Sequence, residues 1–226
     1  MAREHPLLTG FAQGMRDCLP VAISVVAYAL VFGMLARQKG LSPLDVLAMS
    51  GFAFSGAAQF VVLDLWAPPL PFWPIVLATL IVSLRYLLIC ASCLPLFAHW
   101  PRGRAIAAMF LVTDENWAVT MGQPKPLAGH MLGGGALLYL GWTLATTAGC
   151  ALGTLVDDPA RWGLDFAFTA TFLALLIGMR RGRADLLPWA VAAVVAVAAS
   201  HLLPGKWYIL VGGLAGSLAG VTRRGG

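Results

Sequence analysis

Long runs without charged residues dominate the hydrophobic pattern of the chain. They cover 18–36, 46–63, 65–84, 86–101, 126–156, 166–179, 186–205 and 207–222. A helix needs about 20 mostly apolar residues to cross a bilayer, and several of these runs reach that length. The pattern predicts an all-α integral membrane protein, a polytopic helical bundle of about six to eight membrane segments.

Two of the runs, 46–63 and 166–179, are short and contain small and polar residues. Each begins beside an acid, Asp45 or Asp165. We interpret both as short broken or re-entrant helices that do not cross the membrane fully. Full spans are then expected near 18–36, 72–98, 104–122, 129–153, 186–203 and 207–222.

Basic residues fall into four main clusters that constrain the topology. Lys and Arg are retained on the cytoplasmic side of membrane proteins. An even number of crossings must therefore separate successive clusters, and this holds if the two short runs do not cross. Arg37 and Lys39 then lie on the outer side. The clusters are Arg3/Arg16, Arg102/Arg104, Arg180/Arg181/Arg183 and Arg223/Arg224.

Weak self-similarity favours an internal duplication within a single transmembrane domain, 1–226. The segment 51–60 aligns with 164–172, and Ser92–Pro95 aligns with His201–Pro204. Repeats over 10–122 and 126–222 would be separated by an odd number of crossings, so the second would be inverted. In that architecture two broken helices meet near the bilayer midplane and form a solute site.

Composition excludes several other protein classes. The chain is 59% hydrophobic and only 11% charged, whereas soluble domains carry about 25% charged residues and disordered chains have low hydrophobicity. The net charge of +5 is explained by membrane topology rather than by nucleic-acid binding.

Metal, cofactor and catalytic motifs give little support for an enzyme. Cys90 and Cys93 have the spacing of a redox or metal pair, but no second ligand group accompanies them, so we expect no metal. The sequence lacks the phosphate-binding motif Gly-x-x-x-x-Gly-Lys-Ser/Thr and a dinucleotide-binding fingerprint. It also lacks the hydrolase motifs Gly-x-Ser-x-Gly and His-Glu-x-x-His. We therefore expect no cofactor and no enzymatic activity.

Three charged residues in apolar surroundings are the first candidates for function, because charges inside a bilayer usually face the protein interior or a water-filled path. Arg85 could bind a carboxylate bidentately, or it could be a structural partner of an acid such as Asp114. Asp114 and Glu115 are candidates for proton coupling, because a desolvated carboxylate can take up and release a proton near neutral pH. The alternative is an interfacial acid pair.

Two polar residues of the short segments, Gln59 and Asp165, are the next candidates. The ends of broken helices offer free N–H and C=O groups to the zwitterionic ends of an amino acid. Helix–helix hydrogen bonding, or N-capping by Asp165, is the alternative. Small residues also recur at helical spacing and predict close helix packing, within the chain or against a partner. They are Gly129/Gly133, Gly149/Gly153 and Gly212/Gly216/Gly220.

At a series of motifs along nearly the whole chain, the sequence resembles the AzlC family, the large subunit of bacterial branched-chain amino acid exporters. The motifs are Leu19-Pro20-Val21, Gly40-Leu41-Ser42, Ala48-Met49-Ser50, Phe54-Ser55-Gly56-Ala57-Ala58-Gln59-Phe60, Val82-Ser83-Leu84-Arg85-Tyr86, Leu111-Val112-Thr113-Asp114-Glu115 and Gly163-Leu164-Asp165-Phe166-Ala167. The resemblance implies a multi-pass protein of the bacterial inner membrane, a substrate of the leucine, isoleucine and valine class, and a small AzlD-like membrane partner.

The sequence departs from the family pattern at three positions. Ser83 stands where the family usually has Asn, Tyr86 where it usually has His, and Ser55 where Ala is common. The expected substrate-binding residues are therefore Gln59, Ser83, Arg85, Asp165, Ser55 and Gly56. If Ser83 and Tyr86 line the path, substrate choice differs from that of the family's better-known members.

These observations favour a proton-coupled secondary exporter of branched-chain or similar apolar amino acids. Two alternatives stay open, a non-transporting membrane scaffold or regulatory subunit and a transporter of a different small solute. An intramembrane enzyme is disfavoured because no catalytic constellation is found.

Overall fold

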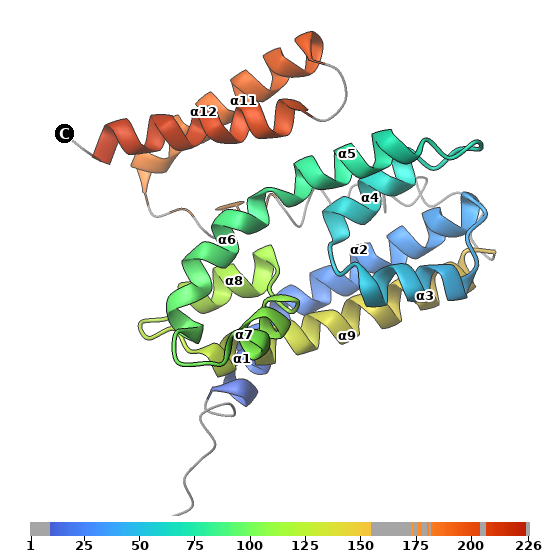
Figure 1. Cartoon of the computed structure of the whole chain (residues 1–226), viewed down its shortest axis with the longest axis horizontal. Coiled ribbons are helices and arrows are strands. Elements are labelled where there is room, and N and C mark those ends of the chain that lie inside the picture. Colours follow the sequence, from blue (N-terminus) through green and yellow to red (C-terminus); the bar gives the residue numbers. More distant parts are fainter. Residues whose placement is uncertain are drawn as a thin grey trace, which may run out of the picture.

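Two long helices that lie side by side, α2 (Leu19–Gln38) and α9 (Ala128–Leu152), form the centre of the fold (Figure 1). The computed structural model describes residues 10–154, 182–203 and 207–224, together with Leu173, Leu176, Ile177 and Arg180. Every regular element of the described residues is helical. A short helix, α1 (Phe11–Asp17), precedes α2 and also packs on α9.

Glycines allow the backbones of α2 and α9 to touch. An ideal Cβ on Gly149 would lie 2.2 Å from the carbonyl oxygen of Leu30, and one on Gly33 would lie 2.1 Å from that of Thr146. No side chain fits at either position, so the helices approach as closely as small residues permit. The predicted close packing at Gly149 is confirmed, and its partner is within the chain.

The α2–α9 pair runs parallel. Gly14 of α1 lies against His130 near the start of α9, and Gly33 lies against Thr146 near its end. The first spans of two inverted repeats would run antiparallel, so these two helices do not show the inverted relation. The duplication itself stays a prediction, because most of 155–181 lies outside the described residues.

The segment predicted to be broken at 46–63 consists of two short helices, α3 (Pro43–Phe52) and α4 (Gly56–Asp64). Ser42 starts α3 with a capping box, in which its hydroxyl and backbone N–H both bond Asp45. In Figure 1, α3 starts at the end of the bundle where α2 ends, and α4 leads back toward that end.

Helix α3 is fastened to α9 by polar contacts. The Ser50 and Thr146 hydroxyls are 2.9 Å apart and buried, and Tyr139 donates to the carbonyl oxygen of Gly51 at 3.0 Å. Hydrogen bonds of this kind hold helices together in an apolar medium.

Helices α5 (Phe72–Ser83) and α6 (Arg85–Cys93) follow each other almost end to end. With the short 3-10 turn η1 (Leu94–Phe97) they form one apolar stretch of 26 residues, which matches the span expected at 72–98. Arg85 lies close to the middle of this stretch.

A single span at 104–122 was expected, and this prediction was wrong. The region forms two helices, α7 (Arg102–Met109) and α8 (Asp114–Met121). The physical reason is the N-cap Thr113, whose extended backbone (φ −125°, ψ 170°) and capping box with Asn116 start a new helix. This broken segment connects at the opposite end of the bundle from α3 and α4, where α2 and α9 begin (Figure 1).

The last two described helices, α11 (Leu186–Leu202) and α12 (Trp207–Arg224), form a hairpin beside α5 (Figure 1). A short 3-10 turn, η4 (Arg183–Asp185), leads into it. Gly212 and Gly216 face α11, since a Cβ at either would lie within 2.7 Å of an alanine Cβ there. The glycine pattern of α12 therefore serves packing within the chain.

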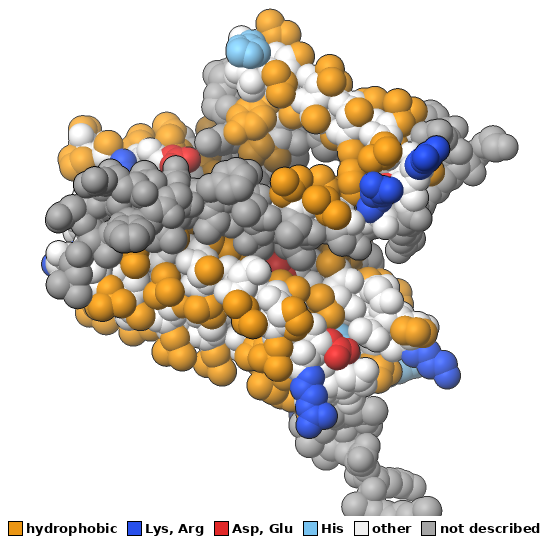
Figure 2. All heavy atoms as spheres, turned by 180° about the vertical axis from the view of Figure 1, so that it is seen from behind, with side chains coloured by type: hydrophobic (Ala, Val, Ile, Leu, Met, Phe, Trp, Pro, Cys, Tyr) orange, Lys and Arg blue, Asp and Glu red, His pale blue; other side chains and the backbone are white. Residues whose placement is uncertain are grey.

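Four helical stretches among the described residues are long and apolar enough to cross a membrane. They are Leu19–Gln38, Phe72–Phe97, Ala128–Leu152 and Arg183–Leu202. Apolar side chains are spread over the face of the molecule that Figure 2 shows. Leucines of α5 and α6 are also exposed, as expected for helices that contact lipid. The predicted all-α polytopic membrane fold is confirmed. The second predicted broken helix, 166–179, lies mostly outside the described residues.

The glycine contact gives a testable prediction about stability. We expect Gly149→Ala to force α2 and α9 apart and to lower the free energy of unfolding by about 1–3 kcal/mol, the usual effect of overpacking. Gly141→Ala is the matched control on the same helix, because its Cβ would meet only Val26 Cγ2 at 3.4 Å. Thermal unfolding of the purified protein in detergent compares the two, and equal stability would contradict the packing argument.

Candidate functional site

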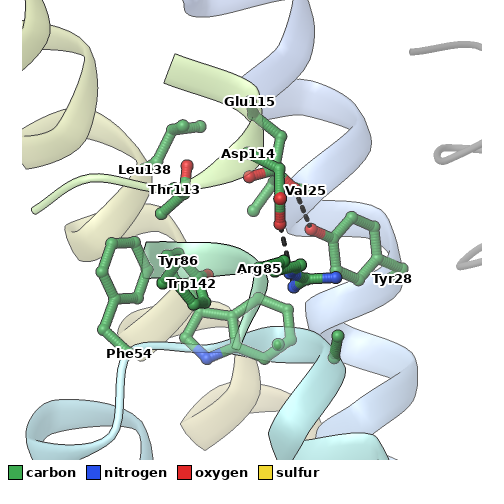
Figure 3. Close-up of a pocket in the computed structure, with 12 residues that line it drawn as sticks. Val25, Tyr28, Phe54, Arg85, Tyr86, Thr113, Asp114, Glu115, Leu138 and Trp142 are labelled. Carbon is green, nitrogen blue, oxygen red and sulfur yellow. Dashed lines mark hydrogen bonds and ion pairs between the residues drawn. The ribbon is translucent and has the colours of Figure 1, made fainter. Parts of the chain in front are cut away.

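A small cavity lies where the two broken segments meet between α2, α6 and α9 (Figure 3). Its volume is about 20 Å³, enough for about one water molecule. Its polar lining residues come from α2, α6, α8 and the residue before α8, and they are Tyr28, Arg85, Tyr86, Thr113, Asp114 and Glu115. Its other lining residues are Val25, Phe54, Gly56, Ala57, Leu138 and Trp142.

An ion pair crosses the cavity between α6 and α8. The Nη2 atom of Arg85 is 2.9 Å from Oδ2 of Asp114, and the two side chains are 33% and 23% exposed. Arg85 is the first residue of α6 and Asp114 the first of α8, so both charges are placed by helix starts. The pairing that the sequence left as an alternative exists, and it lies inside the cavity that both residues line.

Glu115, the second acid of the pair, has a different partner. Tyr28 of α2 donates its hydroxyl hydrogen to Oε1 of Glu115 at 3.1 Å, and Glu115 is only 6% exposed. Figure 3 shows both contacts side by side, with the two carboxylates directed into one cavity. Asp114 thus faces a cation, whereas Glu115 receives its hydrogen bond from an uncharged hydroxyl.

Aromatic and aliphatic side chains form the rest of the cavity wall. Trp142 packs against Tyr28, with ring centroids 5.4 Å apart. Gly56, the first residue of α4, lies against the same indole, since a Cβ there would lie 3.0 Å from Cη2 of Trp142. Leu138 adds an aliphatic surface from the same face of α9. The cavity therefore combines paired charges with an apolar wall.

Gln59 lies behind the cavity wall rather than in it. Its Oε1 accepts from Trp142 Nε1 at 2.9 Å, and its Nε2 donates to the carbonyl oxygen of Ala53 at 3.0 Å. The side chain is 2% exposed. This favours the helix–helix hydrogen-bonding alternative: Gln59 orients Trp142 and satisfies the carbonyl at the α3–α4 break.

The remaining predicted site residues are placed as follows. Gly56 lines the cavity, whereas Ser55 lies one residue before it and is not among the lining residues. Ser83 ends α5, two residues before Arg85, and is not among the lining residues. Asp165 lies outside the described residues.

Sequence reasoning missed Tyr28, Trp142 and Asn116. Tyr28 and Trp142 each lie inside a long apolar run, where a polar-tipped aromatic is a weak signal that a buried partner exists. Asn116 is fully buried, and its amide donates to the carbonyl oxygens of Leu111 and Met131 at 2.8 and 3.0 Å. The Thr113-x-x-Asn116 capping spacing was the signal for that residue.

The four cysteines are free thiols, and Cys90 and Cys93 form no disulfide. Within the part of the chain that the structure describes, no group of three or more His, Cys, Asp or Glu side chains is placed to hold a metal ion.

Gln59 provides a test of how the cavity wall is built. We expect Gln59→Leu to leave the buried Trp142 N–H unsatisfied and to cost about 1–3 kcal/mol, whereas the Ala53 carbonyl oxygen keeps its hydrogen bond from the Ser55 backbone N–H at 2.7 Å. Thermal unfolding in detergent measures the loss. Gln13→Leu is the control, because that amide is exposed and its hydrogen bond to Asp17 is 3.5 Å long. A Gln59→Leu protein as stable as the control would contradict this role.

Comparison with known proteins gives the chain a family. The model of the AzlC protein family matches residues 20–156. An uncharacterized membrane protein of Archaeoglobus fulgidus is 29% identical over 182 residues, 76% of this chain and 77% of the relative. Inner membrane protein YgaZ of Escherichia coli is 26% identical over 222 residues, 94% and 90% of the two chains.

A further relative covers most of the chain. An uncharacterized membrane protein of Helicobacter pylori is 25% identical over 211 residues, 92% of each chain. No solved structure matches the chain. The family model covers more than half of the sequence and includes α2 through α9, which supply the whole described cavity. The chain belongs to the AzlC family of membrane proteins.

Proposed function

We propose that this protein is a secondary transporter that exports branched-chain or similar apolar amino acids across the inner membrane. The observation that carries the proposal is the cavity at the two helix breaks, which holds a cation and two carboxylates beside an aromatic wall. A charge near the bilayer centre costs about 2.5–3.5 kcal/mol on insertion scales. Groups retained at that cost are expected to bind something.

The arrangement of charges favours a zwitterionic solute. Arg85 and Asp114 satisfy each other when the cavity is closed. A bound amino acid offers its carboxylate to Arg85 and its ammonium group to Asp114, so the solute separates the pair and leaves both charges paired. An anion or a cation alone would leave one of the two uncompensated, which is costly in a poorly hydrated site.

The apolar wall favours a solute with a hydrocarbon side chain. Leu138, Val25, Phe54 and the indole of Trp142 face the cavity, and none of these groups can hydrogen-bond a polar side chain except through the indole N–H. That N–H is already bonded to Gln59. The resemblance to AzlC exporters carries the same expectation of leucine, isoleucine or valine.

Glu115 is the better of the two acids for proton coupling. Protonation of Asp114 would remove the charge that pairs with Arg85, whereas protonation of Glu115 breaks no described ion pair. A proton moved across the membrane supplies about 2.3 kcal/mol per 100 mV. We therefore assign the coupling proton to Glu115 and the solute to Arg85 and Asp114.

The cavity must open for a solute to enter. Its volume of about 20 Å³ suits about one water molecule, which is far less than an amino acid needs. The two broken segments connect at opposite ends of the bundle, so each offers a short helix that can move at its own end. Such hinged half-helices around a fixed site are the basis of alternating access.

Basic side chains set the expected orientation. Arg16, Arg102, Arg104 and Lys125 lie in elements at the end where α2 and α9 begin, whereas Arg37 and Lys39 lie at the other end. The positive-inside rule places the first end in the cytoplasm. A small AzlD-like membrane subunit is the expected partner, and its contact surface is left unassigned.

The first test asks whether the ion pair binds solute or only stabilises the fold. In everted membrane vesicles we expect Arg85→Leu, Asp114→Leu and the double variant all to abolish leucine counterflow, because each loses the zwitterion site. Thermal stability should follow a different order. The double variant should be more stable than either single variant, since one buried charge without its partner is the worst case.

Arg102→Leu is the control for a lost basic residue, because that side chain is exposed at a helix start. Counterflow retained in the double variant would contradict solute binding by the pair and would favour a scaffold or regulatory subunit. Counterflow of a different zwitterion, with none of leucine or valine, would contradict the substrate class alone.

The second test separates coupling from binding. We expect Glu115→Gln to keep leucine exchange at equal pH on the two sides, because the amide still accepts from Tyr28. Leucine uptake driven by a pH gradient should be lost, because the amide carries no transferable proton. Gradient-driven uptake at the wild-type rate would contradict the assignment to Glu115.

A further inference from the structure

A second buried polar cluster lies at the end of the bundle where α2 and α9 begin. It contains His130 near the start of α9, Asp17 at the end of α1, Thr120 of α8 and Gln123 just after α8. None of these residues lines the cavity, and the proposed function assigns none of them a role.

The contacts within the cluster are specific. His130 is 3% exposed, its Nδ1 is 2.8 Å from the Thr120 hydroxyl oxygen, and its Nε2 is 3.2 Å from Oδ2 of Asp17. Gln123 donates to the same Asp17 oxygen at 3.3 Å. The Asp17 side chain is 35% exposed, so it connects the buried imidazole with water.

This set of partners can satisfy the imidazole in both of its protonation states. When the ring is neutral, Nε2–H donates to Asp17 and the Thr120 hydroxyl donates to Nδ1. When the ring is charged, both nitrogens donate, and the Thr120 hydroxyl accepts instead because it can rotate. A structural histidine needs only one of these states.

The cluster lies between the cavity and the basic end of the bundle. Helix α8 carries Glu115 at the cavity and Thr120 at the cluster, a separation of about 7.5 Å along a helix that rises 1.5 Å per residue. About one and a half helix turns therefore separate Glu115 at the cavity from Thr120 at the cluster.

The geometry points to His130 and Asp17 as a second proton site, through which the coupling proton passes between Glu115 and the water at the basic end. This inference rests on the proposed function. The proton leaves the Glu115 carboxyl group, which becomes a carboxylate, and water admitted when the cavity opens carries it to the Thr120 hydroxyl, which passes a proton on to Nδ1 of the imidazole. The resulting cation is paired with Asp17, and its Nε2 proton passes to that carboxylate and then to water.

Other titratable groups lie close to the cluster along the chain. They are Arg16 and Cys18, which flank Asp17, Glu115, which lies five residues before Thr120 on α8, and Lys125, two residues after Gln123. Among them only Glu115 is both an acid and a lining residue of the cavity. In this proposal Glu115 is therefore the group that links the cluster to the cavity.

The test uses everted vesicles, in which the basic end faces the outer medium, and radiolabelled leucine. With His130→Gln we expect leucine exchange at equal pH to stay close to the wild-type rate. We expect pH-gradient-driven uptake to fall about tenfold or more, as when a positioned proton acceptor is lost. Asp17→Asn, which keeps the hydrogen bond to Nε2, should give the same split, and His99→Gln, an exposed histidine at the same end, should give neither effect.

Two outcomes would overturn the inference. One is gradient-driven uptake at the wild-type rate in both variants, and the other is equal loss of exchange and driven uptake in inserted protein, which indicates a role in folding or binding. If wild-type vesicles show no leucine exchange, the proposed function fails instead. A readout without solute then decides, because the ¹⁵N-histidine NMR signal that His130→Gln removes must report an imidazole that both gains and loses a proton.

Discussion

The structure depends on one constraint, that an interrupted helix inside a membrane must satisfy the backbone groups its interruption sets free. This chain meets the constraint twice in the same way. At the first break Gln59 bonds the carbonyl of Ala53, and at the second Asn116 bonds the carbonyl of Leu111. Each amide lies in the first turn or so of the helix that follows its break. With these bonds made, irregular backbone can be placed in the interior, and the site is built there.

Two different kinds of polar group therefore share the interior. Gln59 and Asn116 make fixed hydrogen bonds to backbone and indole groups, and they hold the breaks in place. Arg85, Asp114, Glu115 and the His130–Asp17 pair are ionisable and make contacts that a solute or a proton can exchange. The first group explains why the cavity has its shape, and the second supports the proposed chemistry.

Sequence reasoning predicted the helices well where hydrophobic length decides the structure, as in α2, α9, α11 and α12. It also predicted the break at 46–63, from small and polar residues in a short run. It failed at 104–122, because the hydrophobicity of a whole segment does not reveal a single N-cap residue such as Thr113, which ends one helix and starts the next. Arg85, Asp114, Glu115 and Gly56 were found because charge and glycine are conspicuous in an apolar chain. Tyr28 and Trp142 were not found, since their role depends on which distant helices meet.

The glycine contact between α2 and α9 has a consequence for motion. Backbones in direct contact, with carbonyl oxygens seated where a Cβ would be, leave no side chains that could rearrange as the helices slide. The pair is therefore expected to behave as a rigid frame. The short helices, which are held to this frame by a few hydrogen bonds, are then the parts expected to move. The molecule is thus divided into a rigid core and two moving segments, one at each membrane face.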